Sequence, residues 1–481
     1  MAKAPAPGGR PITISLGTQS NPGRYGADGS ARLINMYAEK IGGEGKIQWP
    51  LYAVDGLREF ANLVGAVGSG VRAMLALDDS TLLVVAGQLL YQVSFDGSSI
   101  EVATVGGVTE TGPVTMARNR AANPMVAIVV SGAYYIWQNG VLTAISDVDL
   151  PAANSVAHLD GYFIFGISDG RMFASGIDDD DVTAIDFARA EANPDGLVRV
   201  AVRGRDLCAF GAKTTEFWRN TGEETFPLSR GEVIDVGLLS TTSVATIEQT
   251  LAFVAHDGTV RMLNGYAAQR ISTHAVERSI ADDPDPDMID AVAWEDRGHS
   301  FYAVSGTGYT WVFDALTGLW HERQSYGLAR WQCSSYAKFA GRHIFGHYED
   351  PKLFEASTHY YDEAGSPLVC TVIPPAINIW PYALRLDAVH VDPVPGVGLA
   401  PTNPDQDSAP ELMLETSRDG GVTFGAERRA EIGGLGQRLK RVVLRRFGMF
   451  GEDGVVLKLS VSAAVVRGLT GLAVQLTKLR A

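Results

Sequence analysis

The stretch AGQLLYQVSFDG at residues 86–97 combines a small turn residue, an apolar and aromatic run, and a closing Asp-Gly turn. The same unit returns six times along the chain. It is found as SGAYYIWQNG at 131–140, SDGRMFASGIDD at 168–179, FGAKTTEFWRNTG at 210–222, HDGTVRMLNGY at 256–266, SGTGYTWVFDALTG at 305–318 and, more loosely, YEDPKLFEASTHYYD at 348–362. Short runs of this kind between Gly-containing turns are typical of β-strands joined as hairpins. The sequence therefore predicts an all-β protein.

The spacing of these units indicates a repeat of about 44 residues. Their turn residues lie 45, 38, 41, 47, 50 and 42 positions apart, counted along Gly87, Gly132, Gly170, Gly211, Gly258, Gly308 and Asp350. One or two further apolar runs precede each unit, which gives three to four strands per repeat. Several strands in a repeat of this length are typical of propeller blades. We expect a β-propeller of about six to seven diverged blades; an irregular all-β sandwich with similarly spaced turns is the alternative.

The repeat divides the chain into three parts. Residues 66–368 are predicted to form the propeller. Residues 369–481 read as a smaller antiparallel, platform-like β domain with a Pro-rich loop at 393–410. Residues 1–65 contain an N-terminal arm and strands of their own, which we expect to pack with the C-terminal domain, so that the second β domain is built from the two termini.

The net charge of −15 is distributed unevenly. Residues 1–400 hold 46 acidic and 28 basic side chains, a net charge of −18, whereas residues 401–481 hold 9 and 12, a net charge of +3. Because affinity for nucleic acid depends on Lys and Arg that neutralise phosphates, an acidic body argues against a general nucleic-acid binder. No apolar run approaches the length of a membrane span or a signal peptide, so no membrane partner is expected.

Motifs that carry chemistry are missing from the sequence. Cys208, Cys333 and Cys370 form no Cys-x-x-Cys pair and are expected to be buried thiols. His343, His347 and His359 lie near Glu349 and Asp350, but their spacing does not suit convergence on one metal along a strand. The acidic runs at 178–181 and 282–287 lack the spacing of a calcium loop. We predict no catalytic residues, no metal and no cofactor.

Ser417, Asp419, Gly420 and Gly421 belong to the stretch SRDGGVTF, which is similar to the Asp-box of sialidases and other propellers. The physical basis of this motif is a hairpin turn, since Asp accepts backbone N–H bonds and Gly supplies positive φ. A single box outside the repeats predicts a structural turn.

Basic residues gather on one predicted strand near the C-terminus. They are Arg438, Lys440, Arg441, Arg445 and Arg446, with Arg428 and Arg429 nearby. Side chains two apart share a face of a strand, which places Arg441 and Arg445 opposite Arg438, Lys440 and Arg446. Two interpretations remain open: a solvated edge strand protected by charge, and a subunit or adaptor interface that meets an acidic surface.

Several stretches resemble the tail-hub or nozzle proteins of short-tailed bacteriophages, also called packaged-DNA stabilisation proteins. The resemblance rests on RLINMYAEK at 32–40 with GLREF at 56–60, on residues 188–222 and 279–304, and on LETSRDGGVTFG with RVVLRRFG near the C-terminus. It implies a structural, non-enzymatic protein of the virion tail, made in the host cytoplasm. The implied assembly is a hexamer below the portal-adaptor that closes the DNA exit channel after packaging.

The resemblance also implies partners. They are the portal-adaptor (head-to-tail connector) protein, tail spike or fibre proteins, a needle or plug protein, and phage DNA that passes through the lumen without sequence-specific binding. The alternative function is a tail-associated carbohydrate-binding or glycan-hydrolysing propeller, which would need a carboxylate pair in a concave site.

Overall fold

The computed structural model describes residues 10–25, 29–42, 47–66, 68, 70–190, 195–223, 225–399, 408–438 and 440–479. Strands predominate, and helix α1 (His274–Ala281) is a short exception. Chain contacts separate a first unit, residues 1–58, 309–329 and 357–481, from a second unit, residues 59–308 and 330–356. The predicted arm at residues 1–9 and residues 400–407 of the predicted Pro-rich loop lie outside the described residues.

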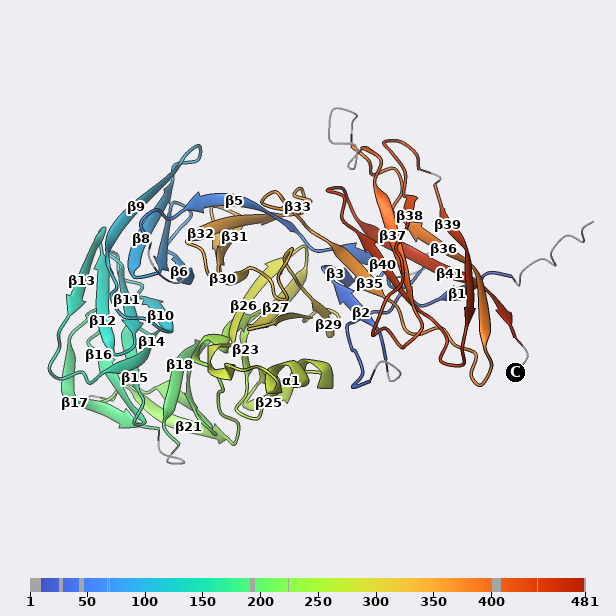
Figure 1. The fold of residues 1–481 in the computed structure, drawn as a ribbon. Coiled ribbons are helices and arrows are strands. Elements are labelled where there is room, and N and C mark those ends of the chain that lie inside the picture. Colours follow the sequence, from blue (N-terminus) through green and yellow to red (C-terminus); the bar gives the residue numbers. More distant parts are fainter. Residues whose placement is uncertain are drawn as a thin grey trace, which may run out of the picture. The chain divides into compact units, whose positions relative to one another are not determined.

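The second unit consists of small antiparallel sheets (Figure 1). Five of its described sheets follow directly along the chain. They are β6 (Val71–Ala76), β7 (Thr81–Ala86), β8 (Leu89–Phe95) and β9 (Ile100–Gly107); β10 (Val114–Arg118), β11 (Met125–Val130), β12 (Ala133–Gln138) and β13 (Val141–Ile145); β14 (Ala153–Leu159), β15 (Tyr162–Ile167), β16 (Arg171–Ser175) and β17 (Val182–Arg189); β18 (Leu197–Arg203), β19 (Asp206–Gly211), β20 (Thr215–Asn220) and β21 (Leu228–Ile234); and β22 (Ala245–Ile247), β23 (Thr250–Val254), β24 (Val260–Asn264) and β25 (Ala267–Arg270).

Two further sheets complete this unit. One contributes the hairpin β26 (Asp290–Asp296) and β27 (His299–Gly306). The other has the order β30-β31-β32-β5, where the fourth strand comes from the opposite end of the sequence. The strands of this sheet are β30 (Cys333–Phe339), β31 (Arg342–His347), β32 (Lys352–Ser357) and β5 (Gly56–Asn62). Strand β5 therefore supplies the fourth strand of the last blade.

The first strands of most successive blades contact one another, the blades that begin with β18 and β22 pack through an apolar cluster around Phe210 and Phe253, and β30 contacts β6, which closes the ring. The middle strands are buried on both faces, as in β11 and β27, which explains their continuous apolar sequences. The outer strands, such as β9 and β13, are largely exposed. This arrangement confirms the predicted propeller within an all-β fold.

A glycine allows the close approach of neighbouring blades where the ring closes. A Cβ atom added to Gly346 on β31 would lie 2.5 Å from Cβ of Val71 on β6, a distance that real side chains do not adopt. Gly166 on β15 faces the next blade in the same way, with Leu197 Cδ2 at 3.0 Å from the added Cβ. Both glycines follow a phenylalanine at the end of the second strand, so the Phe-Gly pair marks the blade junction.

The first unit is a sandwich of two sheets. One has the order β3-β4-β41-β36-β39 with β1 paired to β41, and the other has the order β28-β29-β2-β35-β40-β37-β38. The strands of the first sheet are β1 (Ile12–Ile14), β3 (Met36–Ala38), β4 (Leu51–Ala53), β36 (Leu384–Pro393), β39 (Val442–Phe450) and β41 (Gly468–Lys478). Those of the second are β2 (Arg32–Ile34), β28 (Tyr309–Asp314), β29 (Leu319–Glu322), β35 (Cys370–Ile373), β37 (Glu411–Ser417), β38 (Arg428–Glu431) and β40 (Val456–Val461). The unit also contains a short hairpin of β33 (Asp362–Glu363) and β34 (Ser366–Pro367).

Strands from both ends of the sequence share these sheets. Strands β1 and β4 pair with β41, and β2 pairs with β35. The prediction that the smaller β domain is built from the two termini is confirmed. The unit also includes residues 309–329, which the repeat predicts as part of the propeller.

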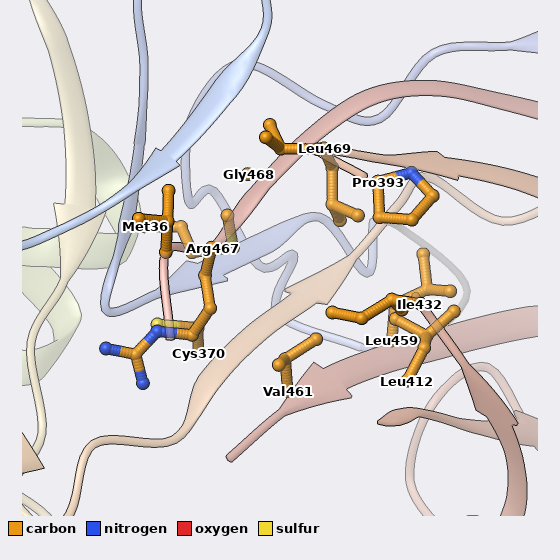
Figure 2. A pocket seen from close by; sticks show the side chains of 12 residues that line it. Met36, Cys370, Pro393, Leu412, Ile432, Leu459, Val461, Arg467, Gly468 and Leu469 are labelled. Carbon is orange, nitrogen blue, oxygen red and sulfur yellow. The ribbon is translucent and has the colours of Figure 1, made fainter. Parts of the chain in front are cut away.

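The core of the sandwich lies between its two sheets (Figure 2). Its apolar side chains surround a cavity of only about 10 Å³. They include Met36 and Leu469 from one sheet and Cys370, Leu412 and Leu459 from the other. A space of this size holds at most one water molecule and offers no room for a ligand.

Candidate assembly surface

Strand β39 is an edge strand, because it stands last in the order β3-β4-β41-β36-β39. Its side chains alternate between the two faces: Val442 and Leu444 are buried, whereas Val443 and Arg445 are exposed. Arg441 precedes the strand and is exposed as well. Arg441, Val443 and Arg445 are two positions apart, so the exposed Val443 lies between two exposed arginines on the same face.

Arg446 interrupts this alternation. Its φ angle of 65° lies in the left-handed region, which non-glycine residues adopt rarely. The pairing with β36 shifts at this point, since Leu386 faces Gly448 but Ala388 faces Arg445. Arg446 and Phe447 therefore form a bulge, a device that prevents an edge strand from pairing regularly with another chain.

Two arginines from other segments bind the backbone of this edge. Arg428 Nη2 donates to the carbonyl oxygen of Arg445 at 2.8 Å, and the Arg428 guanidinium lies 4.6 Å from the centre of the Phe447 ring. Arg418 Nη1 donates to the carbonyl oxygen of Met449 at 2.6 Å. These side chains occupy acceptors that an added strand would need, so the outer edge of β39 is covered from the loop and from β38.

The predicted basic residues fall into two groups. Lys440 Nζ lies 2.7 Å from Glu431 Oε2, and this ion pair lowers the pKa of the Glu431 carboxyl. Arg438, Arg441, Arg445 and Arg446 have no acidic group within 4 Å among the residues that the structure describes. Arg438 and Lys440 precede the strand, which begins at Val442, so they are not part of its alternation. The name basic edge is used below for Arg441, Arg445 and Arg446.

Sequence reasoning did not assign a role to Arg418 or Arg428. Arg418 lies inside the Asp-box stretch, and Arg428 opens β38. The available signal was the pair of phenylalanines on β39, because arginine prefers the face of an aromatic ring. Arg418 lies 4.6 Å from the centre of the Phe450 ring.

The Asp-box stretch forms the turn between β37 and β38. Ser417 Oγ accepts from the backbone N–H of Gly421 at 2.9 Å, and Asp419 Oδ1 accepts from that of Thr423 at 2.9 Å. Gly420 and Gly421 have φ angles of 75° and 94°. Hydrogen bonds from Ser417 and then from Thr423 hold the pKa of Asp419 well below its usual range. The Ser417 hydroxyl and the Asp419 carboxylate therefore serve the turn itself.

The histidines that suggested a metal site are used locally. His347 Nδ1 accepts from the backbone N–H groups of Glu349 and Asp350 at 3.0 and 2.8 Å. His343 Nδ1 lies 3.0 Å from the Tyr336 hydroxyl, and burial lowers the pKa of His343. Among the described residues, no three His, Cys, Asp or Glu side chains are arranged to hold a metal ion.

The three cysteines are buried free thiols, as predicted. Burial raises the pKa of Cys208 to about 12, which keeps this thiol protonated and unreactive. In the part of the chain that the structure describes, no helix has the length and apolar character needed to cross a membrane.

Two family models match the chain in sequence order. The model described as bacteriophage P22 Gp10, beta-propeller, matches residues 30–359, and the model described as bacteriophage P22 Gp10, beta-sandwich, matches residues 383–477. Together they cover both halves of the structure. A search of curated proteins finds no match.

Solved structures with a similar chain course include other propellers. The WD40 β-propeller domain of Doa1 is 13% identical, covers 63% of this chain with 97% of its own, and has a TM-score of 0.44. An inactive virginiamycin B lyase from Staphylococcus aureus, solved with quinupristin, is 10% identical, covers 63% of this chain with 99% of its own, and has a TM-score of 0.46.

Proposed function

This chain belongs to the bacteriophage P22 Gp10 family, and we propose that it is the tail-hub subunit which closes the DNA exit of a short-tailed phage. The membership confirms the resemblance to packaged-DNA stabilisation proteins and makes the chain a phage tail protein. The observation that carries the proposal is that both family models match, in the order propeller and then sandwich.

The proposed assembly is a hexamer below the portal-adaptor, with tail spikes or fibres and a needle or plug attached to it. The support is the contrast of charge within the chain. Residues 1–400 have a net charge of −18, and residues 401–481 have a net charge of +3. Acidic surfaces repel DNA phosphates, which would let the genome pass through a lumen without adhering.

We assign the contact with the adaptor to the basic edge. These three arginines have no acidic group nearby among the described residues, and unpaired cations on a rigid strand suit an acidic partner surface. Arg441, Arg445 and the exposed Val443 between them present cations around an apolar centre. That combination is common in protein–protein contacts, where Arg is enriched and Lys is depleted.

We also propose that the protein is not an enzyme. The family is structural. The Asp-box motif also occurs in sialidases, but here Ser417 and Asp419 use their polar atoms within the turn. A glycan hydrolase would need two carboxylates free to act in a concave site.

The test uses electron-microscopic class averages of the purified protein mixed with portal-adaptor rings. We expect the wild-type protein to dock as a ring of subunits, and the variant R441E/R445E/R446E to lose this density. The substitutions leave the bonds to Arg428 in place, because those bonds use backbone carbonyl oxygens.

The matched control is K213E/R205E/K338E, which changes the net charge by the same amount at three exposed positions of the propeller unit. The control is expected to dock normally. Docking of the basic-edge variant at the wild-type level would refute the interface, and failure of the wild-type protein to bind the adaptor would refute the assembly.

A further inference from the structure

Two cavities open along the axis of the propeller unit. One, of about 880 Å³, is lined by β6, β10, β18, β22, β26 and β30, and the other, of about 350 Å³, is lined by β6, β10, β14, β18 and β22. Four residues line both: Met116, Arg199, Val244 and Thr246. The two cavities therefore meet as one channel inside the ring of blades, and Arg199 lies where they join.

This channel is basic although the chain is acidic. Its charged lining consists of the cations Arg72, Arg118, Arg120, Arg199 and Arg330 and the anions Asp285 and Asp290. The excess of cations contrasts with the net charge of −15 for the whole chain. Low-dielectric walls concentrate the field of such a lining and favour the entry of anions.

Most of the arginines in the wider cavity are bound to the protein itself. Arg72 donates from three nitrogens to the carbonyl oxygens of Gly112 and Gly87. Arg330 Nη2 lies 2.9 Å from Asp290 Oδ2, and its guanidinium lies 4.3 Å from the centre of the Tyr348 ring. Both side chains have a structural role: Arg72 binds backbone carbonyl oxygens, and Arg330 neutralises Asp290.

Arg199 differs from them. Its Nη1 donates to the carbonyl oxygen of Thr241 at 2.6 Å and reaches that of Val244 at 3.4 Å. Its Nε atom is buried and has no hydrogen-bond partner among the described residues, and no carboxylate pairs with the group there. A buried donor left without a partner costs free energy that a bound anion would recover.

The chemistry of the donors that have no partner in the protein selects the ligand. With Nη1 engaged, the Nε and Nη2 groups remain, and this pair of parallel N–H donors matches two oxygens of a carboxylate or a phosphate. Burial lowers the pKa of Arg199 to about 10, so the guanidinium stays charged at neutral pH.

We propose that the junction of the two cavities is a binding site for a small oxyanion, a phosphate or a carboxylate, held by Arg199. Thr246, which lines both cavities, supplies a hydroxyl beside it. The site is enclosed by the inner strands of several blades, so the anion would bridge them and stabilise the closed ring.

Calorimetric titration and thermal unfolding of the full-length protein test this proposal. The probes are inorganic phosphate and succinate, each at ionic strength held constant with chloride, so that general screening cancels. We expect saturable binding and a rise in the unfolding midpoint with at least one probe. The two probes distinguish a phosphate from a carboxylate ligand.

The variant R199K keeps the charge but loses the pair of parallel donors. We expect its affinity for the same anion to fall about tenfold or more. The matched control is R205K, an exposed arginine in the turn after β18 of the same blade, which should bind like the wild type. Equal affinity of R199K and the wild type, or no binding of either probe to the wild type, would overturn the site.

If R199K does not fold, a density map of the wild-type protein with selenate tests the same site without a variant. Selenate density beside Arg199 Nε and Nη2 is the supporting result. Density for the anion elsewhere and none at Arg199 is the refuting one.

Discussion

Asp290 is a carboxylate that the propeller keeps largely out of water. It lies at the start of β26, and Arg330 Nη2 approaches it to 2.9 Å. Burial, which outweighs the attraction of Arg330, raises the pKa of Asp290 from 3.8 to about 6. The folded protein therefore binds a proton at Asp290 more tightly than the unfolded chain does.

This shift has a definite sign. Protonation of Asp290 stabilises the fold below pH 4, and that contribution is lost as the pH rises through about 6. Two pKa units correspond to about 3 kcal/mol at most. In the variant D290N the side chain cannot ionise, so the free energy of unfolding should lack this component.

Urea unfolding at pH 4, 5, 6 and 7 measures the effect as a difference between the two proteins. We expect the wild type to lose about 2.4 kcal/mol relative to D290N between pH 4 and pH 7. The contributions of all other carboxylates to the pH dependence are the same in both proteins, so they cancel when one free energy of unfolding is subtracted from the other. Parallel pH curves for the two proteins would contradict the raised pKa.

At the scale of elements, β39 illustrates how an edge strand is protected. Its bulge at Arg446 and the two arginines bound to its carbonyl oxygens leave little regular backbone for another strand. The alternation of the sequence indicates the strand and its exposed arginines. The bulge was beyond sequence reasoning, since nothing in the letters RRF requires a positive φ, and the bond from Arg428 depends on two strands of different sheets.

Removal of one of these arginines should weaken the unit and free its edge. In R428A the carbonyl oxygen of Arg445 loses its donor and Phe447 loses its cation, so we expect a loss of about 1 kcal/mol in the free energy of unfolding. We also expect reversible self-association, because the edge of β39 becomes available.

Urea unfolding and sedimentation velocity detect the two effects. The matched control is R429A, the next residue on β38, whose guanidinium pairs with Glu427 at 2.6 Å. An exposed pair of this kind contributes little. If R429A and R428A behave alike, Arg428 has no special role at the edge.

At the scale of the molecule, the propeller closes with a strand from far away in the sequence. Residues 56–62 form β5, the fourth strand of a blade whose other strands lie at 333–357. The 44-residue period and its turns predict the successive blades, since each repeat is local. This last pairing has no local signal, and neither does the role of Arg199, which depends on the inner strands of several blades coming together.

Leu63, just after β5, measures the strength of this closure. It is fully buried in a cluster with Phe339 and Leu353 of the last blade and Leu82 of the first. L63A should cost about 3 kcal/mol through the lost contacts and the cavity that remains. V64A is the control, because Val64 is 78% exposed and its truncation should change stability by less than about 0.5 kcal/mol. Similar stabilities for L63A and V64A would show that this segment does not close the ring.

The measurement that tests the proposed function most directly is the DNA content of phage particles made without this protein. The gene for this protein is deleted from the phage, and the heads are assayed for nuclease-resistant DNA during and after packaging. If the protein is a hub that closes the exit, heads without it should package DNA normally and then lose it. Wild-type protein supplied in trans should restore retention of the genome. Particles that lack the protein and yet retain a full, nuclease-resistant genome would contradict the account.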